Sequence, residues 1–376
     1  MTQPLRLEDL GLPGRRHEDW RWTDLSAIDA ALAARANDTA PDHQRWLIDG
    51  VEGPVLVFVD GRYLPEASRP ETIASLSPDV REDREVAALG RLAVREAEAG
   101  IVLRLGADHA TRGPVQLIHI ATGGPAHLAH RIELAEDAQA SIVETYVGAP
   151  DSWTNVAVAI DLARSARLMR TVRRLGDGGV HTETLRTEVG QGASYAGTTL
   201  LAHAENVRIE SHARLHGLGA FASIDGVMLG RGTQTYDVVN RIEHAAPGGS
   251  SRQTWRSVAD ERATLSFSGK IEVARDAQKT DAEQSVKALL LQRTATANAK
   301  PELEIYADDV KCAHGATVGE LSRDALFYLA SRGVPPVEAR ALLTESFLSD
   351  ALETIGEEAV REAVTADAIG WLRRSA

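Results

Sequence analysis

The chain has 376 residues, of which 43% are hydrophobic and 25% are charged, and its formal net charge at pH 7 is −13. This length is enough for two or three domains with a sizeable core. Because so acidic a surface repels the phosphate backbone of nucleic acids, we expect no nucleic-acid partner. No stretch approaches the roughly 20 apolar residues that a membrane helix needs.

The first residues, Met1 to Trp20, are polar with mixed charge and contain no apolar signal-peptide core. We therefore expect a cytoplasmic protein. The single cysteine, Cys312, excludes an intramolecular disulfide. It also excludes a self-contained metal site built mainly of thiolates, so any metal chemistry at Cys312 needs other ligand types or another chain.

Residues 1–100 have a mixed, mostly helical pattern. Apolar residues recur at helical spacing from Trp20 to Ala33. The apolar run Val55–Val59 predicts a strand that ends in a turn. A further helix is predicted over Glu82–Ala99, closed by Gly100.

From about residue 101 to residue 319 the hydrophobic period changes to two. In residues 207–215 every odd position is small or apolar and every even position is polar, which is typical of a half-buried strand. Such a run of strands forms a sandwich, a barrel or a parallel β-helix. The connections lack a regular series of Asn-Gly or Asp-Gly hairpin signals. Glycine-rich corners at 176–179 and 217–219 favour the parallel β-helix.

Residues 320–376 return to helical spacing. Ser322 is the predicted N-cap of a first helix, which Gly333 ends. Pro335 and Pro336 begin a second helix, and a third follows. This small helical region has its own apolar stripe, so it can dock on the β core or on another protein.

Familiar catalytic motifs are absent from the sequence. No Walker A string occurs, so we expect no ATP hydrolysis by this chain itself, and there is no Gly-x-Ser-x-Gly elbow. The pair His127-x-x-His130 lies in a turn-like stretch and is interpreted as a surface pair rather than a metal site. His244 shares strand parity with Val238 and Ile242, so we interpret it as a hydrogen-bonded histidine of the core.

The segment 301–319 carries the strongest chemical signal. Cys312 and His314 are two residues apart, so an extended backbone puts both on one face, roughly 6–7 Å apart along the strand. A thiol and an imidazole can offer two soft ligands to iron. Two ligands leave the metal half bound, which suits transfer better than storage. The alternative is a small buried cysteine beside a structural histidine, and spacing alone favours that alternative.

The same segment closely resembles the C-terminal signature of the SufB/SufD family of iron–sulfur cluster assembly proteins. The resemblance continues through Ala277–Gln284, Ala325–Gly333 and the pattern His244-x-x-Pro247. It is strong over residues 236–350 and weaker elsewhere. SufB members are longer and carry more cysteines, so this chain is more similar to the SufD branch of the family.

The resemblance implies a right-handed parallel β-helix over residues 101–319, flanked by a mostly helical region at 1–100 and a helical region at 320–376. It implies a non-catalytic scaffold that pairs with a SufB-like subunit and a SufC-like ABC ATPase. Such a complex builds clusters from iron and from sulfur that a cysteine desulfurase system supplies. When isolated, a chain of this kind can pair with itself through the β-helix.

The resemblance also assigns roles to particular residues. His314 matches the histidine expected to ligate a nascent cluster at the SufB–SufD interface, and Cys312 matches a neighbouring family cysteine. The cluster is transient and shared, so none is expected to stay on the isolated chain. His244 and Glu304 are candidate structural or interface residues. The helical region is expected to receive the ATPase through Phe327, Tyr328, Leu342 and Phe347.

Two other functions remain as alternatives. The chain could be a purely structural partner in the same complex, with no ligand role. It could also be a β-helix enzyme that acts on polysaccharides, which requires acidic and basic side chains gathered on one strand face. Glu302, Glu304, Asp308 and Asp309 offer carboxylates, but no separate array of aligned Asp and Arg residues accompanies them.

Overall fold

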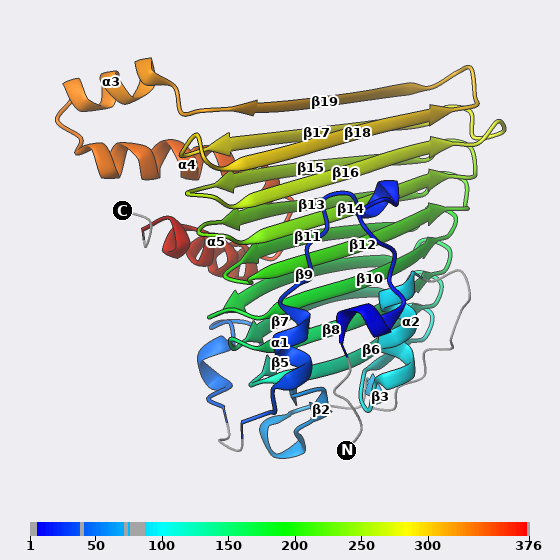
Figure 1. Ribbon diagram of the computed structural model, residues 1–376. Coiled ribbons are helices and arrows are strands. Elements are labelled where there is room, and N and C mark those ends of the chain that lie inside the picture. Colours follow the sequence, from blue (N-terminus) through cyan, green and yellow to red (C-terminus); the bar gives the residue numbers. More distant parts are fainter. Residues whose placement is uncertain (1–5, 38–40, 71–73, 76–86, 374–376) are drawn as a thin grey trace.

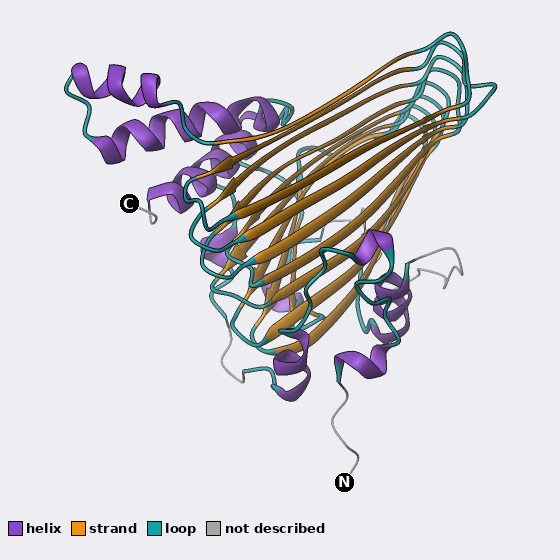
Figure 2. Cartoon of the chain, turned by 45° about the horizontal axis from the view of Figure 1, so that its top comes forward, coloured by secondary structure: helices purple, strands orange, loops and turns teal. Residues whose placement is uncertain are grey.

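The computed structural model describes residues 6–37, 41–70, 74–75 and 87–373. The chain folds as a parallel β-solenoid, in which successive strands alternate between two sheets (Figure 1). Figure 2 shows the strands stacked turn upon turn, with the helices outside them. The prediction of a mainly β fold, with a parallel β-helix core and helical regions at both ends, is confirmed.

Among the described residues, ten strands form one sheet and nine form the other. In spatial order, sheet A contains β2 (Arg62–Tyr63), β1 (Val55–Val59), β5 (Val115–Ala121), β7 (Gln139–Gly148), β9 (Arg167–Gly176), β11 (Ser194–Ala202), β13 (Phe221–Gly230), β15 (Ser250–Ala259), β17 (Asp281–Leu290) and β19 (Lys311–Gly319). Sheet B contains β3 (Ala74–Ser75), β4 (Val102–Leu105), β6 (Gly124–Leu134), β8 (Ser152–Leu162), β10 (Val180–Val189), β12 (Asn206–Leu215), β14 (Thr235–His244), β16 (Thr264–Val273) and β18 (Thr296–Ile305). The predicted strand Val55–Val59 is β1, and its parallel pairing with β5 places it in sheet A.

The alternation predicted for residues 207–215 is confirmed, because every odd position of β12 is buried between the sheets. Arg208 is the exception among the even positions. Its side chain is 1% exposed, because the N-terminal segment covers it on the outer face of sheet B. The guanidinium lies 2.6 Å from Asp237 Oδ2 and 4.6 Å from the centre of the Trp20 ring.

One corner of the solenoid repeats the same backbone arrangement from turn to turn. Its residues adopt the left-handed conformation, with φ between 58° and 68°, and they are Asp108, Asp137, Ser165, Gly192, Gly219, Gly248 and Lys279. Each donates its N–H to the carbonyl just before the equivalent position of the next turn, over 2.7–3.1 Å. This ladder holds successive turns in register. Glycine adopts this conformation without strain, and Asp and Ser tolerate it.

The N-terminal helices pack on the outer faces of both sheets. Those on sheet B are η1 (Leu7–Leu10), η2 (Glu18–Trp20), α1 (Ile28–Ala33) and α2 (Ala88–Glu96), of which α1 and α2 lie against β6 and β8. Those on sheet A are η3 (Gln44–Trp46) and η4 (Pro65–Ala67), which lie against β1 and β5. The prediction of one helical face from Trp20 to Ala33 is wrong. A turn separates η2 from α1, although Trp20 and Ile28 are buried in the same cluster. The helix predicted over Glu82–Ala99 begins at Ala88, and residues 82–86 lie outside the described part of the chain.

The C-terminal helices are α3 (Arg323–Ser331), α4 (Pro336–Leu352) and α5 (Glu358–Arg373). The predicted N-cap is confirmed, since Ser322 Oγ accepts from the Ala325 N–H at 3.3 Å. Helices α4 and α5 bury an apolar face against sheet A, whereas α3 has no buried residue and extends away from the solenoid (Figure 1). None of the described helices is long and apolar enough to cross a membrane.

Candidate functional site

The predicted iron-binding segment lies at the open end of the solenoid. Strands β18 and β19 are the last strands of sheets B and A (Figure 1). Each pairs with one neighbour, β18 with β16 and β19 with β17. Within the described residues no further strand covers either one, so each keeps a free edge. The side chains of both strands are consequently more exposed than those of the preceding turns.

Cys312 and His314 lie on the same side of β19, as the spacing predicted. In the parallel register Cys312 pairs with Ala282 and His314 with Gln284, both of which are buried between the sheets. Cys312 is half-buried against an apolar cluster that includes Ala282, whereas His314 is exposed. Burial raises the pKa of the Cys312 thiol above its usual value. The protonated thiol is a poor metal ligand, so His314 is the readier donor on the isolated chain.

The two other predicted residues have different surroundings. Glu304 lies on the outer face of β18, where its Oε1 is 2.7 Å from Lys270 Nζ. A half-exposed ion pair of this kind stabilises a fold little. His244 is fully buried, and its Nε2 lies 2.9 Å from Ser251 Oγ. The prediction of a hydrogen-bonded core histidine is therefore confirmed for His244.

The residues predicted to receive the ATPase lie on the C-terminal helices. Phe327 and Tyr328 on α3 are 77% and 57% exposed, and Leu342 on α4 is 46% exposed. Leu342 also lines a groove of about 910 Å³ between α4, α5 and the corner after β17. Phe347 is half-buried against the apolar cluster that joins α4 and α5 to sheet A. Three of the four side chains are thus apolar and exposed on the outside of the molecule.

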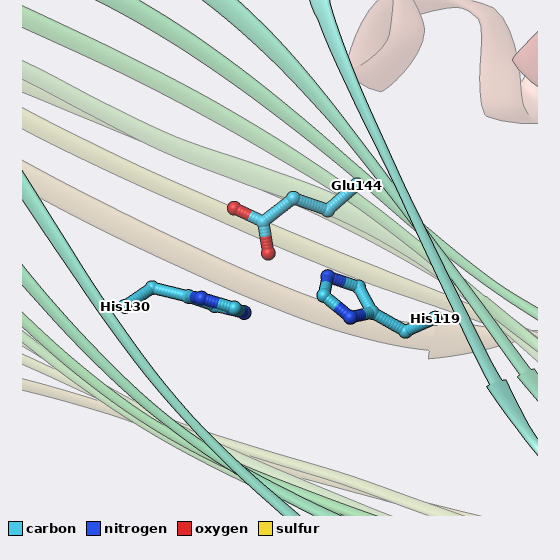
Figure 3. A group of neighbouring side chains, drawn as sticks. All are labelled: His119, His130 and Glu144. Atoms are coloured by element: carbon cyan, nitrogen blue, oxygen red, sulfur yellow. The ribbon is translucent and has the colours of Figure 1, made fainter. Parts of the chain in front are cut away.

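A buried group that sequence reasoning missed lies deeper in the solenoid. His119 of β5, His130 of β6 and Glu144 of β7 point toward one another, with ligand-type atoms within 4.8 Å (Figure 3). The interpretation of His127 and His130 as a surface pair in a turn is wrong, because both belong to β6 and His130 is fully buried.

The protonation of His130 argues against a metal ion in this group. The Ile101 N–H donates to His130 Nδ1 at 3.1 Å. A neutral imidazole that accepts at Nδ1 carries its proton on Nε2. A histidine that binds a metal needs an unprotonated nitrogen toward the metal, while its other nitrogen carries the proton and donates it to a neighbour. In His130 the nitrogen left for a metal, Nε2, is the protonated one. Burial lowers the pKa of His130 to about 4, which keeps the ring neutral.

Glu144 is also held by other partners. Both of its oxygens accept from Arg170, at 2.6 and 2.8 Å, and Oε2 accepts from Tyr146 Oη at 2.5 Å. Arg170 Nη1 also lies 2.8 Å from Glu183 Oε1, and all these side chains are buried. The His119 ring is stacked between Phe58 and Tyr146, at 4.8 and 4.5 Å between ring centres. We assign the whole group to the polar interior of the solenoid.

A weak sequence signal for this interior does exist. Glu144 shares strand parity with the inward residues Ile142 and Tyr146, and Glu183 shares parity with Leu185. A charged residue at an inward position indicates a buried partner of opposite charge, because an unpaired buried charge is very costly. The sequence does not show which strand supplies that partner.

Comparison with known proteins identifies the family. Residues 119–347 match the family described as "SUF system FeS cluster assembly, SufBD core domain". The chain is also 30% identical to the iron–sulfur cluster assembly protein SufD of Escherichia coli K12, over 95% of this chain and 88% of that protein. The chain belongs to the SufB/SufD family. Cys312, His314 and Glu304 all lie within the matched residues.

Other SufB/SufD family members give a consistent result. A SufBD family protein of Synechocystis is 29% identical over 93% of this chain and 85% of its own length. SufD of Bacillus subtilis is 32% identical over 41% of this chain. These similarities confirm the predicted resemblance to the SufD branch. They place the chain in a family of iron–sulfur cluster assembly proteins.

The buried histidine of β14 predicts a pH-dependent stability. Burial lowers the pKa of His244 from 6.5 to about 4 in the folded state. As the pH falls, His244 is therefore protonated in the unfolded chain before it is protonated in the folded one. The free energy of unfolding keeps its full value above pH 6.5 and falls as the pH drops from 6.5 to 4. The expected loss from His244 alone is about 3 kcal/mol at pH 4. Urea unfolding of His244→Gln between pH 7 and 4 should show a shallower decline than the wild type.

The matched control for this prediction is His216→Gln, which changes an exposed histidine beyond the end of β12. The control should keep the wild-type pH dependence. An equal decline in wild type and His244→Gln would show that His244 is not buried in neutral form.

Proposed function

We propose that this chain is a non-catalytic scaffold subunit for iron–sulfur cluster assembly. It pairs with a SufB-like subunit through its open end and contributes a ligand to a nascent cluster at that interface. The observation that carries the proposal is the position of His314, exposed on the last strand of sheet A in a family of cluster assembly proteins. The proposed compartment is the cytoplasm.

The open end has the features of a surface that another protein covers. Its backbone edges are unpaired within the described residues, and an exposed edge of this kind readily accepts a strand. Two large apolar side chains at this end, Ile305 and Val318, are 39% and 48% exposed. The end of a second β-solenoid would cover the edges and the apolar side chains together. A second copy of this chain could do so in the absence of the SufB-like partner.

The available ligands explain why the cluster would be shared. Iron–sulfur clusters usually take four protein ligands, mainly thiolates. This end offers two ligands at most, the His314 imidazole and the Cys312 thiol. The remaining ligands must therefore come from the partner subunit. The cluster is cargo that this chain helps to build and releases, from iron and from sulfur that a cysteine desulfurase system supplies.

We assign the ATPase contact to the C-terminal helices. Phe327, Tyr328 and Leu342 are exposed apolar side chains, and no residue of α3 is buried. A helix that leaves large apolar side chains exposed in its own chain is typical of a docking element. The bound protein would be a SufC-like ABC ATPase, which would supply the Walker A motif that is absent from this sequence.

A purely structural role in the same complex is the second candidate. The packing of Cys312 against the apolar cluster near Ala282 favours it, because a half-buried cysteine also acts as a small core residue. The exposure of His314 favours the ligand role, since an exposed imidazole contributes little to packing.

One prediction separates these two candidates. His314→Ala should leave folding and complex formation nearly unchanged, because the side chain is exposed. It should lower iron and sulfide per assembled complex at least severalfold, because alanine has no donor atom. Cys312→Ala should do less to the cluster, since the partner can supply thiolate. The measurement is iron and sulfide content of the purified complex, with the melting temperature of each variant alongside.

Unchanged iron per complex in His314→Ala would remove the ligand role and leave the structural one. A matched control is His216→Ala, which removes an exposed imidazole far from the open end and should leave the iron content unchanged.

A further prediction concerns the ATPase. Phe327→Asp combined with Tyr328→Asp should keep the fold, because both side chains are exposed, and should weaken ATPase binding at least tenfold. The control is Leu218→Asp, which charges an apolar side chain that is 57% exposed at a solenoid corner. Binding is measured by titrating each variant with the ATPase. Wild-type affinity in the double variant would place the docking site elsewhere.

A further inference from the structure

Three amide side chains are buried between the sheets near the open end of the solenoid. They are Asn240 of β14, Gln253 of β15 and Gln284 of β17, and each is 1% exposed. Among the residues that the structure describes, neither the oxygen nor the nitrogen of any of these amides has a hydrogen-bond partner. A buried amide without a partner destabilises a fold, whereas an apolar side chain of similar size would not. Packing alone therefore does not explain these residues.

Gln284 is the one of the three that lies next to the last turn. In the parallel register it pairs with Gln253 on one side and with His314 on the other. Paired residues of adjacent parallel strands lie on the same face of the sheet, and the strands are about 4.8 Å apart. The side chain of His314 therefore follows that of Gln284 along the interior of the solenoid.

The facing sheet leaves room for the Gln284 amide. Gly269 of β16 lies across the interior, and a Cβ atom at Gly269 would overlap the amide nitrogen. In the last turn, the neighbour of Gly269 in register is Pro301 of β18. The register thus places two residues of the last turn beside the amide, Pro301 and His314. Only His314 has a side chain that can donate a hydrogen bond.

We propose that Gln284 is a positioning residue for the His314 imidazole in the assembled complex. This inference rests on the proposed function. The side-chain oxygen of Gln284 accepts the N–H of one ring nitrogen of His314, and the other ring nitrogen, which carries no proton, faces iron. Rotation about the last side-chain bond of Gln284 exchanges its oxygen and nitrogen, so the oxygen can turn toward the imidazole while the amide stays in the interior.

An imidazole that binds a metal needs such an acceptor. A histidine ligand almost always donates its second N–H to a neighbouring group, which fixes both the tautomer and the orientation of the ring. On the isolated chain His314 is exposed, so water competes for both ring nitrogens. When a partner covers the open end, that water is excluded and Gln284 is the buried acceptor that the register places next to the ring.

The test removes two of the buried amides in turn. Gln284→Met keeps the length of the side chain and removes the acceptor. Gln253→Met makes the matched change one turn deeper, away from His314. In the purified complex, the rate at which a chelator removes iron should rise about tenfold or more for Gln284→Met and stay within about twofold of the wild type for Gln253→Met. Equal effects of the two substitutions would indicate a purely structural stack of amides and would overturn the inference.

The conservative variant Gln284→Glu should restore the wild-type behaviour. Its side chain has the same length, and a carboxyl group has an acceptor oxygen in either protonation state. The rate of iron loss should therefore stay within about twofold of the wild type. A loss as fast as that of Gln284→Met would overturn the inference. Affinity for the SufB-like subunit and the melting temperature are measured for every variant, because a structural defect would change them together with the iron.

A second measurement uses the unchanged protein and so does not depend on how the variants fold. In a structure of the wild-type complex with its cluster, the side-chain oxygen of Gln284 should lie about 2.7–3.2 Å from the His314 nitrogen that is not bonded to iron. A His314 ring that donates to a group of the partner instead would contradict the assignment.

The two failures are distinguishable. If His314→Ala keeps the iron content of the wild-type complex, the proposed ligand role fails, and the role of Gln284 fails with it. If His314→Ala lowers the iron content and Gln284→Met does not speed iron loss, only the positioning role of Gln284 fails.

Discussion

The parallel pairing of each turn with the next is the interaction on which the rest of this structure depends. A strand in the middle of the solenoid satisfies its backbone groups on both sides, so the two ends are the places where pairing stops. At the first end, the short strands β2 and β3 add to the sheets in antiparallel fashion. At the other end, β18 and β19 have no such covering strand within the described residues. The exposure of His314 follows from its place on the last turn.

Contacts inside the solenoid keep the last turn, which carries His314, in a fixed position. The corner ladder and the long in-register strands fix each turn on the one before it. Charged side chains are accommodated deep inside because they are paired, as with Arg170 between Glu144 and Glu183. Removing one partner from such a buried pair typically costs 3–5 kcal/mol. These paired groups therefore belong to the structural interior of the solenoid.

Local patterns in the sequence were sufficient for much of this fold. The period of two in β12, the Ser322 cap and the inward parity of His244 each depend on a few neighbouring residues, and the structure agrees with all three. The predictions that were wrong concern residues whose surroundings are set by contacts with distant parts of the chain. Trp20 is buried because it packs over Arg208 on the outside of sheet B. Its distance in sequence from Ile28 therefore resembles the spacing of apolar residues in a helix, although no single helix joins the two residues. The sequence did not predict that His130 lies in a strand, because the first residues of β6 include few apolar side chains. The same-face placement of Cys312 and His314 was predictable, but their unequal burial was not, since it arises from the solenoid ending there.

We propose above that His314 meets a partner's ligands at the open end of the solenoid. The most direct test is an experimental structure of the complex with the SufB-like subunit, assembled anaerobically with its cluster in place. We expect the partner to cover the open end and an imidazole nitrogen of His314 to be bonded to iron. A cluster held entirely by the partner, with the His314 side chain turned to solvent, would contradict it.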